Sequence, residues 1–99
     1  MLNINKTQEN ERLTVVLEGR LDTVTAPQLE ASLQESIPGI TELILDFEKL
    51  DYISSAGLRV LLAAQKIMNR QGSMKLLHLN PSIMEIMEVT GFVDILTIE

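Results

Sequence analysis

The chain contains no cysteine and only one histidine, His78. Without cysteine there can be no disulfide framework, thiolate nucleophile or cysteine-based zinc site, and a single histidine excludes a multi-histidine metal site. No apolar run approaches the roughly 20 residues that span a bilayer, so we expect no membrane insertion. The amino-terminal stretch MLNINKTQENER also lacks the apolar core of a signal peptide.

Positive charge is scarce as well. Eight Lys and Arg residues stand against 14 Asp and Glu residues, which gives a formal net charge of −6. This balance argues against direct nucleic-acid binding, which normally requires a basic face. The 99 residues, 45% of them apolar, suit one globular domain spanning residues 1–99. We expect a soluble, cytoplasmic protein.

The hydrophobic pattern predicts strands that alternate with helices. Strands are expected at residues 2–7, 13–18, 42–47 and 74–79, and helices at 25–37, 56–70 and 80–90. Residues 93–98 are expected to form a last short strand or an edge segment. This order predicts an α/β fold with a mostly parallel sheet, an antiparallel leading hairpin and helices mainly on one face.

Local signals refine this prediction. Thr25 and Gln28 fit a capping box, and Asn80 before a proline fits a helix cap. Gly72 is expected to end the long helix in the left-handed conformation. The run ELILDF at 42–47 predicts a strand that is buried on both faces.

The segment 51–59 (DYISSAGLR) stands out because it joins that strand to the longest helix. Partners and ligands gather outside the carboxyl ends of strands in open α/β sheets, and a helix start there presents free N–H groups. The simpler interpretation is that Ser54 or Ser55 caps the helix and Gly57 allows close packing. The functional interpretation is a serine that is phosphorylated or contacts an anion, since a helix amino terminus accommodates negative charge.

Catalytic and metal-binding alternatives have less support. Ser55 lacks the G-x-S-x-G spacing of a nucleophile elbow, and His78 is expected in the middle of a strand. No nucleotide fingerprint is present, so no cofactor is expected. Asp46, Glu48 and Asp51 could bind a hard cation, but a solvated acidic loop is the favoured interpretation.

The long helix also carries a basic side. Arg59 follows Ser55 by four residues and therefore shares its face, which Lys66 and Arg70 continue. This side is either the solvated face of an amphipathic helix or a basic strip suited to an acidic partner surface. Asp22, at the end of the second expected strand, is a candidate neighbour of Ser55.

Five short motifs follow one another along nearly the whole chain: Gly19-x-Leu21-Asp22, Pro27-x-Leu29, Leu45-Asp46-Phe47, Tyr52-Ile53-Ser54-Ser55-Ala56-Gly57-Leu58 and Thr90-Gly91-Phe92. Together they resemble the anti-sigma factor antagonist family, which is built on the STAS domain. The resemblance implies a four- to five-stranded mixed sheet packed by three or four helices.

The resemblance also implies a function. Members bind an anti-sigma factor with serine kinase activity and so release the sigma factor; the kinase phosphorylates the antagonist, and a serine phosphatase restores it. The family motif usually reads Asp-Ser-Ser/Thr-Gly-Leu, so alignment on Gly57 and Leu58 places Ser55 at the phosphorylated position. Ser54 then replaces the aspartate, and Ala56 replaces the second hydroxyl residue.

The partner-binding residues that the resemblance implies are Asp22, Ser54, Ser55, Ala56, Gly57, Leu58 and Arg59. Two other functions remain open: a STAS scaffold without phosphorylation in a transport or stress-signalling complex, and a small-ligand sensor at the sheet edge. An enzyme has the least support, because the sequence offers no credible acid–base pair.

Overall fold

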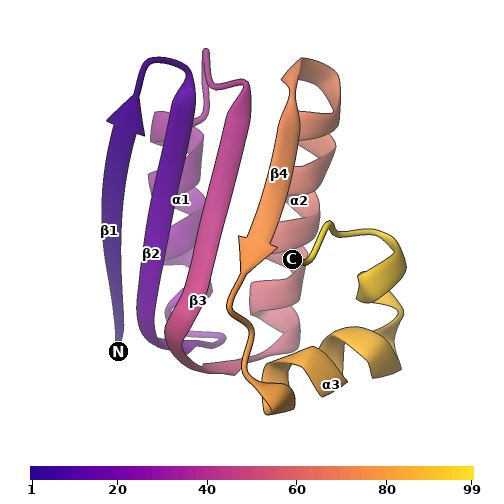
Figure 1. The fold of residues 1–99 in the computed structure, drawn as a ribbon. Helices are drawn as coiled ribbons and strands as arrows, with labels where there is room; N and C mark the ends of the chain where they lie inside the picture. Colours follow the sequence, from indigo (N-terminus) through magenta and orange to yellow (C-terminus); the bar gives the residue numbers. More distant parts are fainter.

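A computed structural model describes all 99 residues. One sheet is formed by β1 (Leu2–Glu9), β2 (Arg12–Leu21), β3 (Glu42–Ile53) and β4 (Ser73–Leu77). The strands lie side by side in chain order, as Figure 1 shows. β1 and β2 form an antiparallel hairpin, whereas β2, β3 and β4 are parallel. The predicted mixed sheet is therefore confirmed, with four strands.

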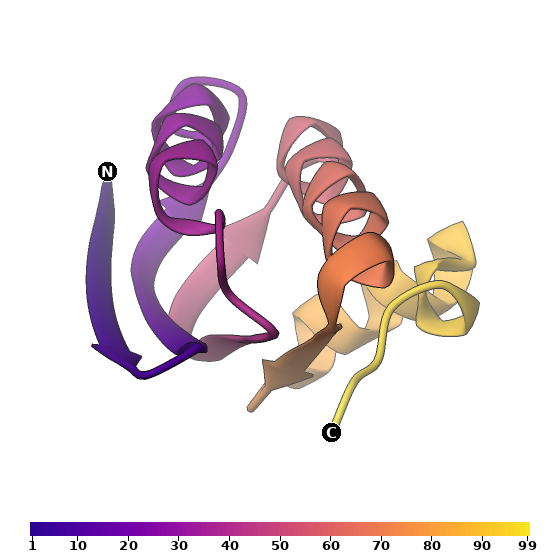
Figure 2. The ribbon, with the colours of Figure 1, turned by 90° about the horizontal axis from the view of Figure 1, so that it is seen from above.

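Three α-helices accompany the sheet: α1 (Ala26–Ser36), α2 (Ser55–Gln71) and α3 (Pro81–Thr90). α1 and α2 lie next to each other on one face of the sheet, and α3 lies beyond the lower end of β4 (Figures 1 and 2). The core forms between these helices and the inward side chains of the strands, of which Phe47 is the largest fully buried one. No helix combines the length and apolar character needed to cross a membrane.

β3 is buried on one face only, so the prediction of burial on both faces was wrong. Its inward residues Leu43, Leu45 and Phe47 are buried, while Ile44 and Asp46 between them are partly exposed. The cause is the layering, since no helix covers the second face of the sheet. An apolar run in sequence does not distinguish these two environments.

Of the two predictions for the carboxyl-terminal segment, the edge segment is confirmed and the strand is wrong. Residues 93–98 do not form a strand; a short 3₁₀ helix, η1, occupies Phe92–Asp94. A single bridge joins Ile98 to Leu76 at the outer edge of β4. The tail therefore covers that edge without extending the sheet by a full strand.

Two predicted helix signals were wrong and one is confirmed. The Thr25 side chain makes no capping bond, and the Gln28 amide donates to the Leu2 carbonyl oxygen instead. Gly72 has an extended φ of 173°; a side chain there would overlap the carbonyl of Thr41, so close approach explains the glycine. Asn80 caps α3 as predicted, accepting the Ile83 N–H at 2.8 Å.

Candidate functional site

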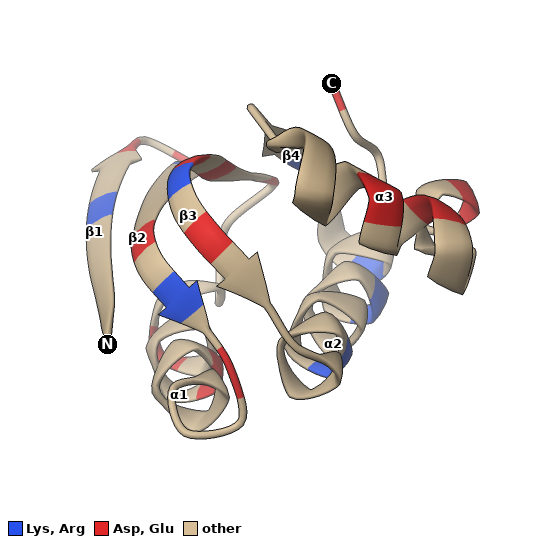
Figure 3. Ribbon diagram, turned by 90° about the horizontal axis from the view of Figure 1, so that it is seen from below, with Lys and Arg blue, Asp and Glu red and all other residues tan.

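The carboxyl ends of β2 and β3 lie side by side, because Leu21 pairs with Ile53. From this edge β2 leads through Asp22 towards α1, and β3 leads directly into α2 at Ser55. Figure 3 views the molecule from this end. The topology thus brings the two predicted segments to one edge, although they are more than 30 residues apart in sequence. We call this edge the rim, defined as residues 20–25 and 52–59.

Ser54 and Ser55 differ sharply in environment. Ser54 is partly buried, its N–H donates to the Leu21 carbonyl oxygen at 2.9 Å, and its Oγ accepts the Gly57 N–H at 3.4 Å. Ser54 is therefore the helix cap. Ser55, the first residue of α2, is exposed and its hydroxyl has no hydrogen-bond partner within the chain. Of the two serines, only Ser55 has an exposed hydroxyl without a hydrogen-bond partner.

The next residues of α2 divide between the core and the surface. Gly57 is buried, and a Cβ there would lie 2.7 Å from Leu21 Cγ and 2.9 Å from Ile53 Cγ1. The side chain of Leu58 is also buried. These two residues seat the helix start on the sheet, whereas Arg59 is exposed and makes no ion pair and Ala56 is partly exposed. Contact with a partner is open to Arg59 and Ala56.

Asp22 shapes the start of α1. Its Oδ1 accepts the N–H groups of Val24 and Thr25, both at 3.0 Å, and the Thr25 hydroxyl. The Thr25 N–H bond is the main cause that lowers the pKa of Asp22, although desolvation opposes it. Asp22 is therefore a fixed negative charge on the rim at neutral pH.

Three further rim residues were not among the predicted partner-binding residues, although Tyr52 lies within the motif around Ser55. The Arg20 guanidinium lies 4.4 Å from the centre of the Tyr52 ring, and its Nε lies 3.8 Å from Asp22 Oδ2. Arg20 and Tyr52 face each other across β2 and β3 after a shift in register, which no sequence pattern reveals. Val24 is 85% exposed beside Asp22, and an exposed valine in a turn is visible only once burial is known.

The rim continues into an open hollow between α1 and α2 of about 210 Å³. Thr23 and Pro27 line it on the α1 side, and Ala56, Arg59 and Val60 line it from α2. The segment that follows Asp22 and the first turns of α2 therefore share one concave surface.

The acidic residues considered as a cation site are arranged differently from the prediction. Asp46 and Glu48 lie near His78, with ligand atoms within 4.8 Å of one another, and Asp51 is outside this group. His78 follows β4 in a left-handed conformation (φ 63°), so its predicted place within a strand was wrong. Its Nδ1 lies 3.0 Å from Asp46 Oδ1, and this hydrogen bond accounts for the grouping.

His78 and Ser55 do not form a catalytic pair. Asp46, which holds the imidazole, precedes the end of β3 by seven residues, or roughly 20 Å along a strand.

Burial tends to raise the pKa of Asp46, but hydrogen bonds from the Glu48 N–H and from His78 lower it overall. The hydrogen bond to Asp46 in turn raises the pKa of His78.

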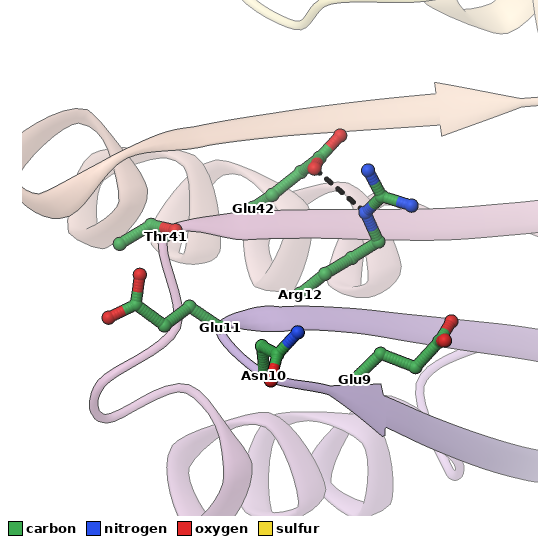
Figure 4. A pocket seen from close by; sticks show the side chains of 6 residues that line it. All are labelled: Glu9, Asn10, Glu11, Arg12, Thr41 and Glu42. Carbon is green, nitrogen blue, oxygen red and sulfur yellow. Dashed lines mark hydrogen bonds and ion pairs between the residues drawn. The ribbon is translucent and has the colours of Figure 1, made fainter.

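A second, polar hollow lies at the opposite end of the strands (Figure 4). The β1–β2 turn lines it together with Thr41 and Glu42, and Arg12 Nε donates to Glu42 Oε1 at 2.8 Å. The charged groups here include three carboxylates, those of Glu9, Glu11 and Glu42. Arg12 is the one basic residue in the lining, and it already pairs with Glu42.

Comparison with known sequences shows similarity over the full chain. The sequence model of the STAS domain matches residues 3–99. BtrV of Bordetella bronchiseptica, provisionally named an anti-sigma factor antagonist, is 42% identical over 84% of this chain and 73% of its own. The anti-sigma-B factor antagonist of Bacillus subtilis is 28% identical over 98% of this chain and 90% of its own.

The fold also matches solved structures. SpoIIAA, an anti-sigma factor antagonist, superposes in its unphosphorylated form with a TM-score of 0.76 and 20% identity, covering 100% of this chain and 87% of its own. SpoIIAA from Bacillus in its phosphorylated form superposes with a TM-score of 0.77 and 21% identity. This match covers 98% of this chain and 91% of the SpoIIAA chain. The fold is thus shared at low sequence identity.

Proposed function

Because this chain belongs to the STAS domain family, we propose that it is an anti-sigma factor antagonist that is switched by phosphorylation of Ser55. The unphosphorylated chain binds an anti-sigma factor through the rim and so releases the sigma factor. The anti-sigma factor is itself the serine kinase that modifies Ser55, and a serine phosphatase removes the phosphate.

The single observation that supports this proposal best is the contrast between Ser54 and Ser55. Ser54 is engaged as the cap, while Ser55 presents a free hydroxyl on the surface of a helix start. A kinase requires an accessible hydroxyl, and Ser55 provides it. The names of two relatives point the same way, since one is an anti-sigma-B factor antagonist and SpoIIAA has been solved in a phosphorylated form.

The rim is suited to a switch that leaves the fold unchanged. A phosphate on Ser55 would add a charge of about −1.5 to −2. The helix amino terminus tolerates this charge, since its N–H groups and dipole favour anions. Because the Ser55 hydroxyl makes no hydrogen bond within the chain, its modification breaks no existing hydrogen bond.

The same charge is costly inside an interface. A buried charge without a partner costs about 3–5 kcal/mol, and about 1.4 kcal/mol corresponds to a tenfold change in affinity. Asp22 places a second, permanent negative charge on the rim. Phosphorylation of Ser55 is therefore expected to weaken binding of the anti-sigma factor by more than about a hundredfold.

Two substitutions at Ser55 test the proposal. Ser55→Asp should weaken binding to the purified anti-sigma factor of the same organism while circular dichroism and melting stay nearly unchanged. Ser55→Ala should bind like the wild type but take up no phosphate from the kinase and ATP. Calorimetric titration and phosphosite mass spectrometry measure the two effects.

Ser54→Ala is the matched control, since it removes the neighbouring hydroxyl and leaves the predicted acceptor in place. If the Ser55→Ala variant still takes up one phosphate per chain, another residue is the acceptor. A stable complex that forms equally with and without ATP would favour a scaffold over a switch.

A further inference from the structure

The strongest unexplained feature outside the rim is the charge of α2. This helix carries three basic residues and no acidic one, so all 14 carboxylate residues lie elsewhere in the chain. Figure 3 shows the contrast between α2 and the acidic α3. The three basic residues, Arg59, Lys66 and Arg70, form the α2 basic strip; all are exposed, and none makes an ion pair.

Helix stability does not explain this strip. The helix dipole favours Arg70 in the last turn, but it does not account for Arg59 or Lys66, which lie outside the terminal turns. Lys66 and Arg70 are like charges four residues apart, a spacing that weakens a helix. A local arrangement that opposes folding without a compensating contact indicates a role in binding.

A groove runs beside the strip. The hollow at the rim shares Glu30 and Val60 with a second, small hollow of about 30 Å³ further along α1 and α2. We call the two together the α1–α2 groove. The second hollow is lined mainly by apolar side chains, including Leu33, Ala63 and Ile67, and Ile67 is 39% exposed. The groove therefore leads from Ala56, next to Ser55, to the far half of α2.

We infer that the α1–α2 groove and the α2 basic strip bind an acidic, amphipathic segment of the anti-sigma factor, as a continuation of the rim interface. Its apolar ridge lies in the groove, and its carboxylates face the strip. This inference rests on the proposed function. It adds a docking surface that extends from Arg59 to Arg70, beyond the phosphorylated end of the helix.

The two walls of the groove favour a protein over other anionic partners. The α1 wall contributes the carboxylate of Glu30, which would repel the phosphates of a nucleic acid or of a lipid surface. The chain as a whole is also acidic, with a net charge of −6. A protein segment can carry an apolar ridge flanked by charged side chains of either sign. Charge complementarity between such a segment and the α2 basic strip would provide specificity and faster association.

The test is the substitution Lys66→Glu in the full-length chain. A carboxylate at position 66 would stand four residues before Arg70, in the favourable orientation for a helix, so the Tm should stay equal or rise slightly. Binding to the purified anti-sigma factor should nevertheless weaken roughly tenfold at low salt. This difference in affinity should shrink at about 1 M salt, where the Debye length is only about 3 Å and charges are strongly screened. Ile67→Ser should also weaken binding, because it removes an apolar contact of the groove.

Lys49→Glu is the matched control, since Lys49 is an exposed lysine on β3 without an ion pair and the change in net charge is the same. Lys49→Glu should bind like the wild type.

If Lys66→Glu binds like Lys49→Glu while Ser55→Asp loses binding, this inference is overturned and the proposed function stands. If the wild type does not bind the anti-sigma factor, both are overturned. Binding of a DNA duplex, or of vesicles of phosphatidylcholine and phosphatidylserine, that is lost in Lys66→Glu would overturn the assignment to a protein segment.

Discussion

Two adjacent serines at the start of α2 have different roles because of one change in backbone direction. Ser54 is still extended (φ −102°, ψ 175°), so its hydroxyl turns back towards the Gly57 N–H. Ser55 is already helical, and its side chain points outwards to solvent. The sequence motif allows either serine to be the cap, and only the backbone conformation separates the two.

This difference predicts unequal effects of alanine substitution on stability. Ser54→Ala removes a helix cap and should lower the free energy of unfolding by about 0.5–2 kcal/mol, towards the lower end because the bond is 3.4 Å long. Ser55→Ala removes no contact and should change it by less than about 0.5 kcal/mol. Urea unfolding of both variants measures the contrast. Equal losses of stability would contradict the assignment of the cap to Ser54.

At the scale of the secondary-structure elements, β3 and the turn after β4 are joined by the pair between Asp46 and His78. The hydrogen bond with Asp46 and its negative charge raise the pKa of His78 above the ordinary value of 6.5. Protonated His78 is therefore favoured in the folded chain. Its contribution to stability is fully present below about pH 6.5 and is lost as the pH rises through the raised pKa.

The corresponding experiment compares the wild type with His78→Gln from mildly acidic to mildly alkaline pH. The wild type should be the more stable protein at the acidic end, and the difference should shrink as the pH rises. Asp46→Asn should remove most of the same pH dependence, since Asp46 is the main cause of the raised pKa of His78 and Glu48 contributes less. A difference that grows with pH would contradict the sign of the pKa shift.

At the scale of the whole molecule, the two faces of the sheet contribute differently to the free energy of unfolding. α1 and α2 cover one face, and the other face carries half-exposed and charged side chains. Leu45 and Ile44 are neighbours on the central strand β3 but point to opposite faces, with Leu45 fully buried. This pair allows the layering to be tested within one strand.

Leu45→Ala should destabilise the chain by about 2–5 kcal/mol, because it leaves a cavity between the sheet and the helices. Ile44→Ala should cost less than half as much, since no layer packs over it. Chemical denaturation of the two variants gives both values. Equal costs would indicate that both faces of β3 are buried, as the sequence pattern suggested.

Much of the fold followed from local sequence. The order of the first four strands and the three helices, the antiparallel and parallel pairing of those strands and the Asn80 cap were predicted from hydrophobic period and turn residues. The errors share one cause, which is that they depended on distant parts of the chain. Gly72 approaches Thr41, and Gln28 bonds to Leu2. Neither contact leaves a trace in the neighbouring sequence.

The candidate site divides in the same way. The sequence by itself determined a serine at a helix start after a buried strand, and its motif pointed to Ser55. Tertiary structure alone decided that Asp22 shares an edge with Ser55, and that Arg20 meets Tyr52. It also decided which serine is free. The physical reason is that helix starts and hydrophobic periods are local properties of the chain, whereas strand register and burial arise only when distant segments pack together.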